Sequence, residues 1–354
     1  MIVTASPAGF TVPLDLAATV PPEARGLLRD EVRLLVATPD GPQHARFRDL
    51  GRFLQPGDLV VVNTSATLPA AVDATRRGGR PVVVHLSATL DDGTWVVELR
   101  QPDGSGPVGD AAGGESISLP AGADLTLIAD HLDPPRTTGS RLWRGHVDVA
   151  GPVEAFLARY GRPITYGYTH GRWPLSAYQT VFAREPGSAE MPSAGRPFTE
   201  RLVTDLVAGG IMFAPVLLHS GVSSLELGEA PQPERYRVPA ATARLVNFTR
   251  RSGRRVIAVG TTTTRALETV AGPDGTVVEG EGWTDLVLAP DRPARVVNGL
   301  VTGWHTPEST HLLLLEAVAG PLLVQATYEE ALEARYLWHE FGDSCLLLPD
   351  EVAS

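Results

Sequence analysis

The stretch 256–268, Val-Ile-Ala-Val-Gly-Thr-Thr-Thr-Thr-Arg-Ala-Leu-Glu, constrains the fold more than any other. Its four apolar residues predict a short buried strand, and Gly260 ends that strand where the chain must turn or let a ligand approach the backbone. The four threonines predict a polar turn, and Arg265 begins a run of good helix formers. Hydroxyls and free N–H groups at a helix N-terminus suit polar or anionic ligand groups. The alternative interpretation is an ordinary loop whose threonines cap the helix.

Strands and helices alternate around this stretch, in residues 1–70 and from residue 151 onward. Apolar runs predict strands near 29–36 and at 59–62, 211–218, 284–288, 298–302 and 345–348. Helical spacing predicts helices at 47–54, between Thr199 and Gly209-Gly210, from Pro239 to 251, and at 312–319 and 328–336. This alternation indicates an α/β fold with a largely parallel sheet, open or closed, and ligands at the carboxyl ends of its strands.

Residues 71–150 have a different pattern. Three runs alternate with period two, at 82–86, 95–99 and 142–149, and turns rich in Gly, Asp and Pro separate them. A small antiparallel barrel or sandwich is therefore expected here. We therefore expect a large α/β domain of residues 1–70 and 151–354 and a small antiparallel β domain of residues 71–150.

Composition excludes several classes of protein. The 354 residues contain no apolar run near the roughly 20 residues that span a bilayer, and the N-terminus does not resemble a signal peptide. Cys345 is the only cysteine, which excludes an internal disulfide and a multi-cysteine zinc site, and no metal-binding motif is present. We therefore expect a cytoplasmic protein without metal or membrane. The net charge of −11 argues against a protein whose main task is to bind the phosphate backbone of a nucleic acid. A local basic face is compatible with this net charge.

Two histidines follow predicted strands, His219 after 211–218 and His305 after 298–302. A histidine at such a position can act as a general acid or base near neutral pH. The alternative is a histidine that hydrogen-bonds to the backbone at a strand end. The phosphate-cradling glycine motifs of dinucleotide and nucleoside-triphosphate sites are absent, as is a Gly-x-Ser-x-Gly elbow.

Several long motifs resemble the S-adenosylmethionine:tRNA ribosyltransferase-isomerase family of queuosine biosynthesis. They are Tyr-Gln-Thr-Val-Phe-Ala-Arg-Glu-Pro-Gly-Ser at 178–188, Arg-Val-Ile-Ala-Val-Gly-Thr-Thr at 255–262 with Arg-Ala-Leu-Glu at 265–268, His305 with Pro307 and 309–310, and Tyr336 with 342–343. Similar matches occur in the N-terminal part at 29–30, 33–36, 47–50, 56–58, 63 and 69–70. The resemblance covers nearly the whole chain in order.

The resemblance implies a complex, barrel-like α/β large domain with an inserted small antiparallel β-barrel domain. It also implies an enzyme that transfers and isomerises the ribosyl part of S-adenosylmethionine onto the aminomethyl group of 7-aminomethyl-7-deazaguanine in tRNA. Adenine and methionine leave in this reaction. S-adenosylmethionine is then a substrate, and no permanently bound cofactor is expected.

The resemblance and the strand-end positions together give a set of candidate site residues. His219 and His305 are expected to move protons, while Thr261, Thr262 and Arg265 bind the polar end of S-adenosylmethionine, with Arg265 counted among the catalytic residues. The other candidate substrate-binding residues are Tyr178, Gln179, Gly195, Phe198, Thr199, Glu234 and Gly260.

The chain departs from the family pattern inside several motifs. Arg196-Pro197 stands where the family has Leu-His, Gln232 replaces a histidine, and Ser65, Ala66 and Ala71 lie in a segment that has lost two arginines. The family's His-Val-Gly-x-Gly-Thr-Phe reads His-Ser-Gly-Val-Ser-Ser-Leu at 219–225, and its Thr-Asn-Phe-His reads Thr-Gly-Trp-His at 302–305. Lost arginines remove bidentate contacts to phosphate or carboxylate. The departures, with the acidic charge, weaken the expectation of tRNA as a partner. They leave open a divergent enzyme with a small-molecule acceptor or none, in a lyase or cyclising reaction, or a relative that only binds S-adenosylmethionine.

Overall fold

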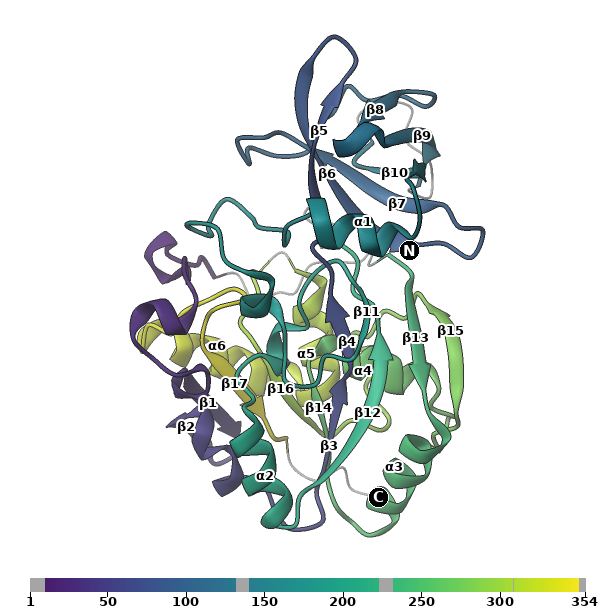
Figure 1. Ribbon diagram of the computed structural model, residues 1–354. Coiled ribbons are helices and arrows are strands. Elements are labelled where there is room, and N and C mark those ends of the chain that lie inside the picture. The colour runs from purple at the N-terminus through teal and green to yellow at the C-terminus, as the bar shows by residue number, and fades with distance from the viewer. Residues whose placement is uncertain (1–9, 132–139, 223–231, 308, 350–354) are drawn as a thin grey trace.

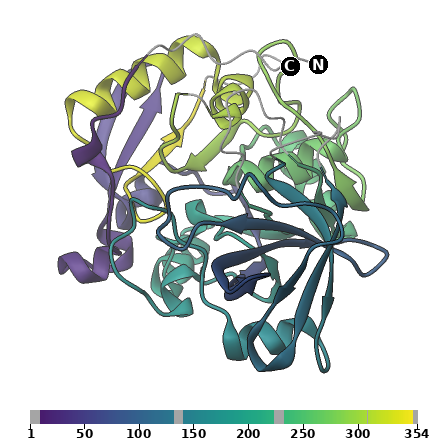
Figure 2. The same cartoon turned by 90° about the horizontal axis from the view of Figure 1, so that it is seen from above.

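The computed structural model describes residues 10–131, 140–222, 232–307 and 309–349. A nine-stranded mixed sheet with helices around it forms the larger part, and a closed six-stranded barrel stands at one end of it (Figure 1). Both views place the barrel over the half of the molecule that carries β12, β13 and β15, away from β1 and β2 (Figures 1 and 2). The predicted α/β class and the inserted antiparallel barrel are confirmed.

The large sheet has parallel strands at its centre. In spatial order its strands are β15 (Gly280–Thr284), β13 (Glu234–Val238), β12 (Met212–Leu218), β3 (Leu59–Asn63), β14 (Val256–Val259), β16 (Gly299–Thr302), β17 (Ser344–Leu347), β1 (Arg33–Thr38) and β2 (Gly41–Arg46). β12, β3, β14 and β16 run parallel, with Val61 opposite both Ala214 and Ala258. Their carboxyl ends therefore share one edge. β13, β15, β17 and β2 each pair antiparallel with a neighbour, so the sheet is mixed and not largely parallel.

Helices cover both faces of this sheet. The helices on the sheet are α2 (Glu200–Ala208), α3 (Ala240–Arg251), α4 (Thr261–Thr269), α5 (Thr310–Ala319) and α6 (Pro321–Glu333), while α1 (Val153–Tyr160) lies elsewhere. On one face α2 and the short 3₁₀ helix η4 (Phe47–Arg52) pack on Val60 and Ile257. On the other face α3, α4, α5 and α6 pack on the alternate side chains, including Val61 and Ala258. No described helix is by itself long and apolar enough to cross a membrane, and α5 and α6, which reach that length together, meet at a bend of 119°.

The barrel has its own hydrophobic core. Its strands, in order around the barrel, are β10 (Leu142–Asp148), β7 (Trp95–Arg100), β6 (Arg80–Thr89), β5 (Ala71–Arg76), β8 (Ser116–Ser118) and β9 (Asp124–Asp130). Phe156 and Leu157 of α1 belong to the same core, so this helix packs with the barrel. A two-stranded parallel ladder of β4 (Ser65–Thr67) and β11 (Glu185–Ser188) lies between the barrel and the sheet (Figure 1). The exact domain limits remain a prediction.

Several predicted elements differ from the structure. The four threonines do not form a turn, because α4 begins at Thr261 with Gly260 as its N-cap at a left-handed φ of 90°. The hydroxyls of Thr263 and Thr264 donate to the carbonyls of Val259 and Gly260 at 2.8 and 3.2 Å, which satisfies them inside the helix. The strand predicted at 284–288 is also wrong, since β15 ends at Thr284. The last helix, predicted near 328–336, spans Pro321–Glu333.

Candidate functional site

A cavity of about 710 Å³ lies between the barrel and the carboxyl edge of the central strands. Its volume is within the roughly 300–1,000 Å³ of ordinary small-molecule sites. Ser87 and Arg100 of the barrel contribute to its wall, as do Ser220 after β12, Gly260 after β14 and Thr302 at the end of β16. The site therefore lies where parallel strands end, as the fold class predicts.

The N-terminus of α4 faces this cavity. Thr261 and Thr262 line it, and their N–H groups belong to the first helical turn, which has no carbonyl partners of its own. Gly260 is required here, because a Cβ at its φ of 90° would also lie 3.3 Å from the Cβ of Ala194. Asn63, at the end of β3, connects this strand to the end of β12, because its Nδ2 donates to the Leu218 carbonyl at 2.7 Å. The arrangement presents N–H groups to a polar or anionic ligand group.

Arg265 and Glu234 form an ion pair in the cavity wall. The guanidinium also donates from Nε to the Leu286 carbonyl and from Nη2 to the Thr284 carbonyl, both at 3.1 Å. Burial raises the pKa of Glu234, and the charge of Arg265 opposes that shift. The guanidinium thus binds two carbonyls and holds Glu234 in place, and the ligand contact expected of Arg265 stays a prediction.

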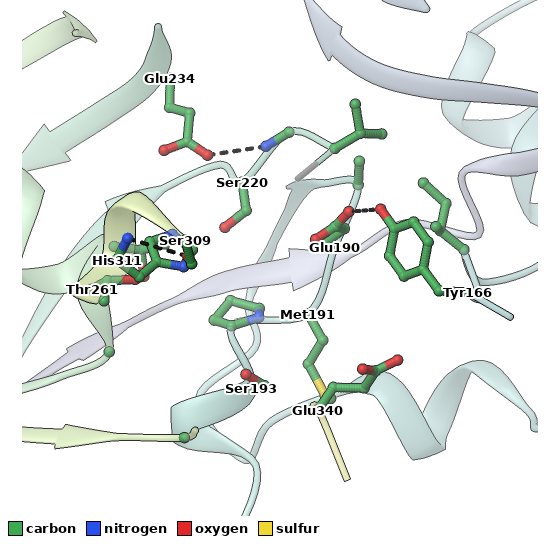
Figure 3. A pocket seen from close by; sticks show the side chains of 18 of the residues that line it. Tyr166, Glu190, Met191, Ser193, Ser220, Glu234, Thr261, Ser309, His311 and Glu340 are labelled. Carbon is green, nitrogen blue, oxygen red and sulfur yellow. Dashed lines mark hydrogen bonds between the residues drawn. The ribbon is translucent and has the colours of Figure 1, made fainter. Parts of the chain in front are cut away.

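Two half-buried histidines, His305 and His311, form a pair in the cavity wall, and Figure 3 shows His311 beside Thr261. The Nδ1 atoms of His305 and His311 are 3.2 Å apart, and His305 Nε2 lies 3.1 Å from the Thr302 hydroxyl. An Nδ1–Nδ1 hydrogen bond requires one ring to carry the proton there and the other to accept it. Burial lowers the pKa of His305 well below its usual 6.5 and that of His311 to about 4. Both rings are therefore neutral at pH 7, and His311 is a residue that the sequence reasoning missed.

His219 lies outside the lining of the cavity. Its Nδ1 is 2.7 Å from the hydroxyl of Ser65, which in turn is 2.6 Å from that of Ser188. The ring packs on Gly187, where a Cβ would come within 2.4 Å of it. The structure thus brings Thr261 and His305 to one cavity, while Ser220, and not His219, reaches it from the end of β12.

Two of the predicted substrate-binding residues, Phe198 and Thr199, have structural partners instead. Phe198 is fully buried, and its ring packs edge-on against Phe47 at 4.9 Å between centroids. The Thr199 hydroxyl caps α2 by accepting from the Leu202 N–H at 3.2 Å. Neither residue lines the cavity.

Gly195 and Gln179 also lie outside the cavity lining, while Tyr178 contributes to it. Gln179 clamps the end of β4, with Oε1 accepting from the Thr67 N–H at 3.0 Å and Nε2 donating to the Thr67 carbonyl at 2.8 Å. Gly195 ends a short 3₁₀ helix whose other residues, Ser193 and Ala194, do reach the cavity. The family motif at 178–188 is therefore mainly a scaffold beside the site.

A second wall of the cavity was not predicted from the sequence. It consists of the paired side chains Tyr166–Glu190 and Tyr168–Glu340 together with His339 (Figure 3 labels three of these residues). The only signal for it was the position of His339 and Glu340 just before the family-like Gly-Asp at 342–343. Among the described residues no group of His, Cys, Asp and Glu side chains could hold a metal ion.

Comparisons with known proteins cover nearly the whole chain. The family described as "Queuosine biosynthesis protein" matches residues 6–347. The curated S-adenosylmethionine:tRNA ribosyltransferase-isomerase of Symbiobacterium thermophilum is 36% identical, with 96% of this chain and 98% of that protein covered. The protein of the same name from Thermotoga maritima is 33% identical, with the same 96% and 98% covered.

A solved structure agrees with these relatives. The crystal structure of S-adenosylmethionine tRNA ribosyltransferase from Thermotoga maritima is 30% identical to the chain, with a TM-score of 0.52, and the alignment covers 96% of this chain and 99% of that one. The resemblance inferred from the sequence motifs is therefore confirmed. Matches of this length and identity show that the chain belongs to the queuosine biosynthesis protein family, an enzyme family whose curated members are named S-adenosylmethionine:tRNA ribosyltransferase-isomerase.

Proposed function

We propose that this chain transfers and isomerises the ribosyl part of S-adenosylmethionine onto a base of tRNA. The names of its relatives support both substrates. The observation that carries the proposal is the single cavity in which the N-terminus of α4 and the His305–His311 pair meet at the carboxyl edge of the parallel strands. S-adenosylmethionine is consumed in this reaction, so it acts as a substrate.

Each part of the cavity matches a requirement of that chemistry. The N–H groups of Thr261 and Thr262 suit a carboxylate or hydroxyl groups of the nucleoside. A proton must leave a carbon next to the sulfonium, and a neutral imidazole such as His305 can accept it. The hydrogen bond to His311 then offers a second nitrogen over which that proton can be shared.

The departures from the family pattern are divided between the scaffold and the cavity wall. Ser65, Ala66, Ala71 and Arg196-Pro197 do not line the cavity, whereas Ser220, Val222, Gln232, Gly303 and Trp304 do. Arg196 is buried, and its guanidinium donates to the Ala177 carbonyl and to Glu23, both at 2.8 Å. Its charge is thus neutralised inside the scaffold. The departures in the scaffold therefore give no specific reason to prefer a small-molecule acceptor over tRNA.

A labelled-substrate experiment tests the proposal. The chain is incubated with S-adenosylmethionine labelled in the ribose, with and without tRNA that carries the aminomethyl base. We expect label in the tRNA and release of adenine and methionine only when that tRNA is present. Release of adenine without RNA would indicate the lyase alternative, and binding of S-adenosylmethionine without any product would indicate a binding-only protein.

A further inference from the structure

The cavity has two walls of different charge. On one side the His305–His311 pair is neutral, and the ion pair of Glu234 with Arg265 neutralises itself. On the other side the Tyr166–Glu190 and Tyr168–Glu340 pairs place two carboxyl groups at the wall, and Figure 3 labels Glu190 and Glu340. A ligand that spans the cavity therefore meets Glu190 and Glu340 at one end, and at the other end a carboxyl group that is already paired with Arg265.

Glu340 has hydrogen-bond donors but, among the residues that the structure describes, no counter-ion. Its Oε2 accepts from the Tyr168 hydroxyl at 2.7 Å, and its Oε1 lies 3.5 Å from the Thr169 hydroxyl. Within the described residues no arginine, lysine or histidine lies at ion-pairing distance from it. Burial raises the pKa of Glu340, while the hydrogen bond from Tyr168 opposes the rise. A cation from a ligand would satisfy this carboxyl group.

Aromatic rings surround the carboxyl groups. The Tyr168 ring stacks on His339 with 3.9 Å between centroids and 11° between planes, and the Tyr166 ring is 6.1 Å away. Ring faces beside a carboxylate attract organic cations, which have weakly hydrated, spread charges. The cationic side chain at this wall, Arg100, lies 5.5 Å from the centre of the Tyr166 ring and shares its charge with the buried Glu98 of the barrel.

An unpartnered hydroxyl marks the same wall. Tyr178 lines the cavity and is only 3% exposed, yet its hydroxyl has no hydrogen-bond partner among the described residues. Burial raises the pKa of Tyr178, and the charge of Glu340 adds to the rise. A buried polar group without a partner costs free energy, and a bound ligand would supply the partner.

We propose that Glu340, held by Tyr168 and flanked by Glu190, is the counter-ion for an organic cation bound in this cavity. The inference rests on the proposed function, which offers two sources of such a cation. One is S-adenosylmethionine, through its sulfonium or its amino group, and the other is an amine on the acceptor base of the RNA. A sulfonium carries a positive charge but has no N–H or O–H group to donate in a hydrogen bond. A protein can therefore stabilise it with a carboxylate and with the faces of aromatic rings.

Binding measurements on the intact protein separate these sources. Calorimetric affinities for S-adenosylmethionine and for the neutral thioether S-adenosylhomocysteine, and the KM for tRNA, are measured for wild type and for Glu340→Gln. Loss of a carboxylate that faces a bound cation should weaken the affected ligand roughly tenfold or more. The matched control is Glu329→Gln, the same change on the exposed side of α6, which should leave all three values unchanged.

Each outcome has one meaning. A loss for S-adenosylmethionine but not for the thioether identifies the sulfonium, and an equal loss for both identifies the shared amino group. An increase in the KM for tRNA alone identifies the amine of the acceptor. Tyr168→Phe, which keeps the ring and removes the hydroxyl that holds Glu340, should give a smaller change in the same quantity.

The failure of this inference is distinct from the failure of the proposed function. If wild type neither binds nor consumes S-adenosylmethionine, the proposed function is wrong. If wild type is active while Glu340→Gln and Tyr168→Phe both match it in all three values, the counter-ion role is overturned. Circular dichroism and the unfolding midpoint of each variant establish that it is folded, and Tyr168→Phe provides the test should Glu340→Gln not fold.

Discussion

At the scale of single residues, the surroundings of each histidine separate the two strand-end candidates. His305 lines the cavity and contacts His311, whereas the ring of His219 contacts Ser65 and packs on Gly187. Both positions look alike in the sequence, because each follows an apolar strand. What the sequence could not provide is the direction of each side chain, which depends on the neighbouring strands β4 and β11.

The first prediction concerns the rate of the chemical step. His305→Gln removes the imidazole that can accept a proton, so we expect kcat to fall by roughly 10²–10⁴ while the affinity for S-adenosylmethionine changes little. His219→Gln serves as the control and should keep kcat near the wild-type value. Single-turnover release of adenine measures both. A His305→Gln enzyme with the wild-type rate would exclude the proton role.

The second prediction concerns stability against pH. The pKa of His311 is about 4 in the folded chain because of burial, against 6.5 for the exposed side chain. As the pH falls from about 6.5 toward 4, His311 binds a proton in the unfolded chain but not in the folded chain. The free energy of unfolding therefore decreases over this range. His311→Gln should show a shallower decrease between about pH 7 and pH 5. Urea unfolding of both proteins checks this, and parallel curves would contradict it.

At the scale of elements, the reliable predictions were those with a local cause. β3 and α2 follow from their apolar runs and from the cap at Thr199, and both form as expected. The threonine run was misread because β-branched, hydroxyl-bearing residues favour turns in isolation. Here the φ of 90° at Gly260 starts the helix early, and hydrogen bonds back to the strand carbonyls keep the threonines in it. The apolar run at 285–288 packs without forming a strand.

The third prediction concerns the cap of α2. Thr199→Ala removes the hydrogen bond from Leu202 and that to Asp30, so we expect a loss of about 1 kcal/mol in the free energy of unfolding. Thr204→Ala, in the exposed middle of the same helix, should cost less. Affinity for S-adenosylmethionine should stay at the wild-type value in both. A tenfold weaker affinity in a stable Thr199→Ala protein would instead support the substrate-binding role inferred from the family.

At the scale of the whole molecule, the site is assembled from segments that are distant in the chain. Tyr166, Glu190 and Glu340 meet only because the sheet and the barrel enclose one cavity. No periodicity of the sequence connects such positions, so the second wall could not be predicted from it. The site residues Gly260–Thr262, in contrast, could be predicted, because they directly follow an apolar strand in the sequence. The family motifs also mark scaffold residues such as Gln179 as strongly as those that line the cavity.

The fourth prediction concerns the charged interior of the barrel. Glu98 is fully buried, and its Oε1 accepts from Arg141 at 2.9 Å and from Arg100 at 3.3 Å. Burial raises the pKa of Glu98, but the neighbouring His85, 3.3 Å away, and the charge of Arg141 hold it below its usual value. Glu98→Ala removes the shared carboxylate from these cations and should cost about 3–5 kcal/mol in unfolding free energy. The surface change Asp92→Ala on the same barrel should have little effect, and equal losses in urea unfolding would contradict the prediction.

The order of strands in the large sheet has a consequence for synthesis on the ribosome. β1 and β3 emerge early, but β1 pairs with β17 and β3 lies between β12 and β14, all of which are translated after the whole barrel. Both edges of β3, and the edge of β1 that faces away from β2, therefore stay without partners while the inserted barrel, whose contacts are local, can already close. The nascent chain thus carries a folded barrel beside a large sheet that is still incomplete. The cavity between them forms only once the last strand, β17, has joined the sheet.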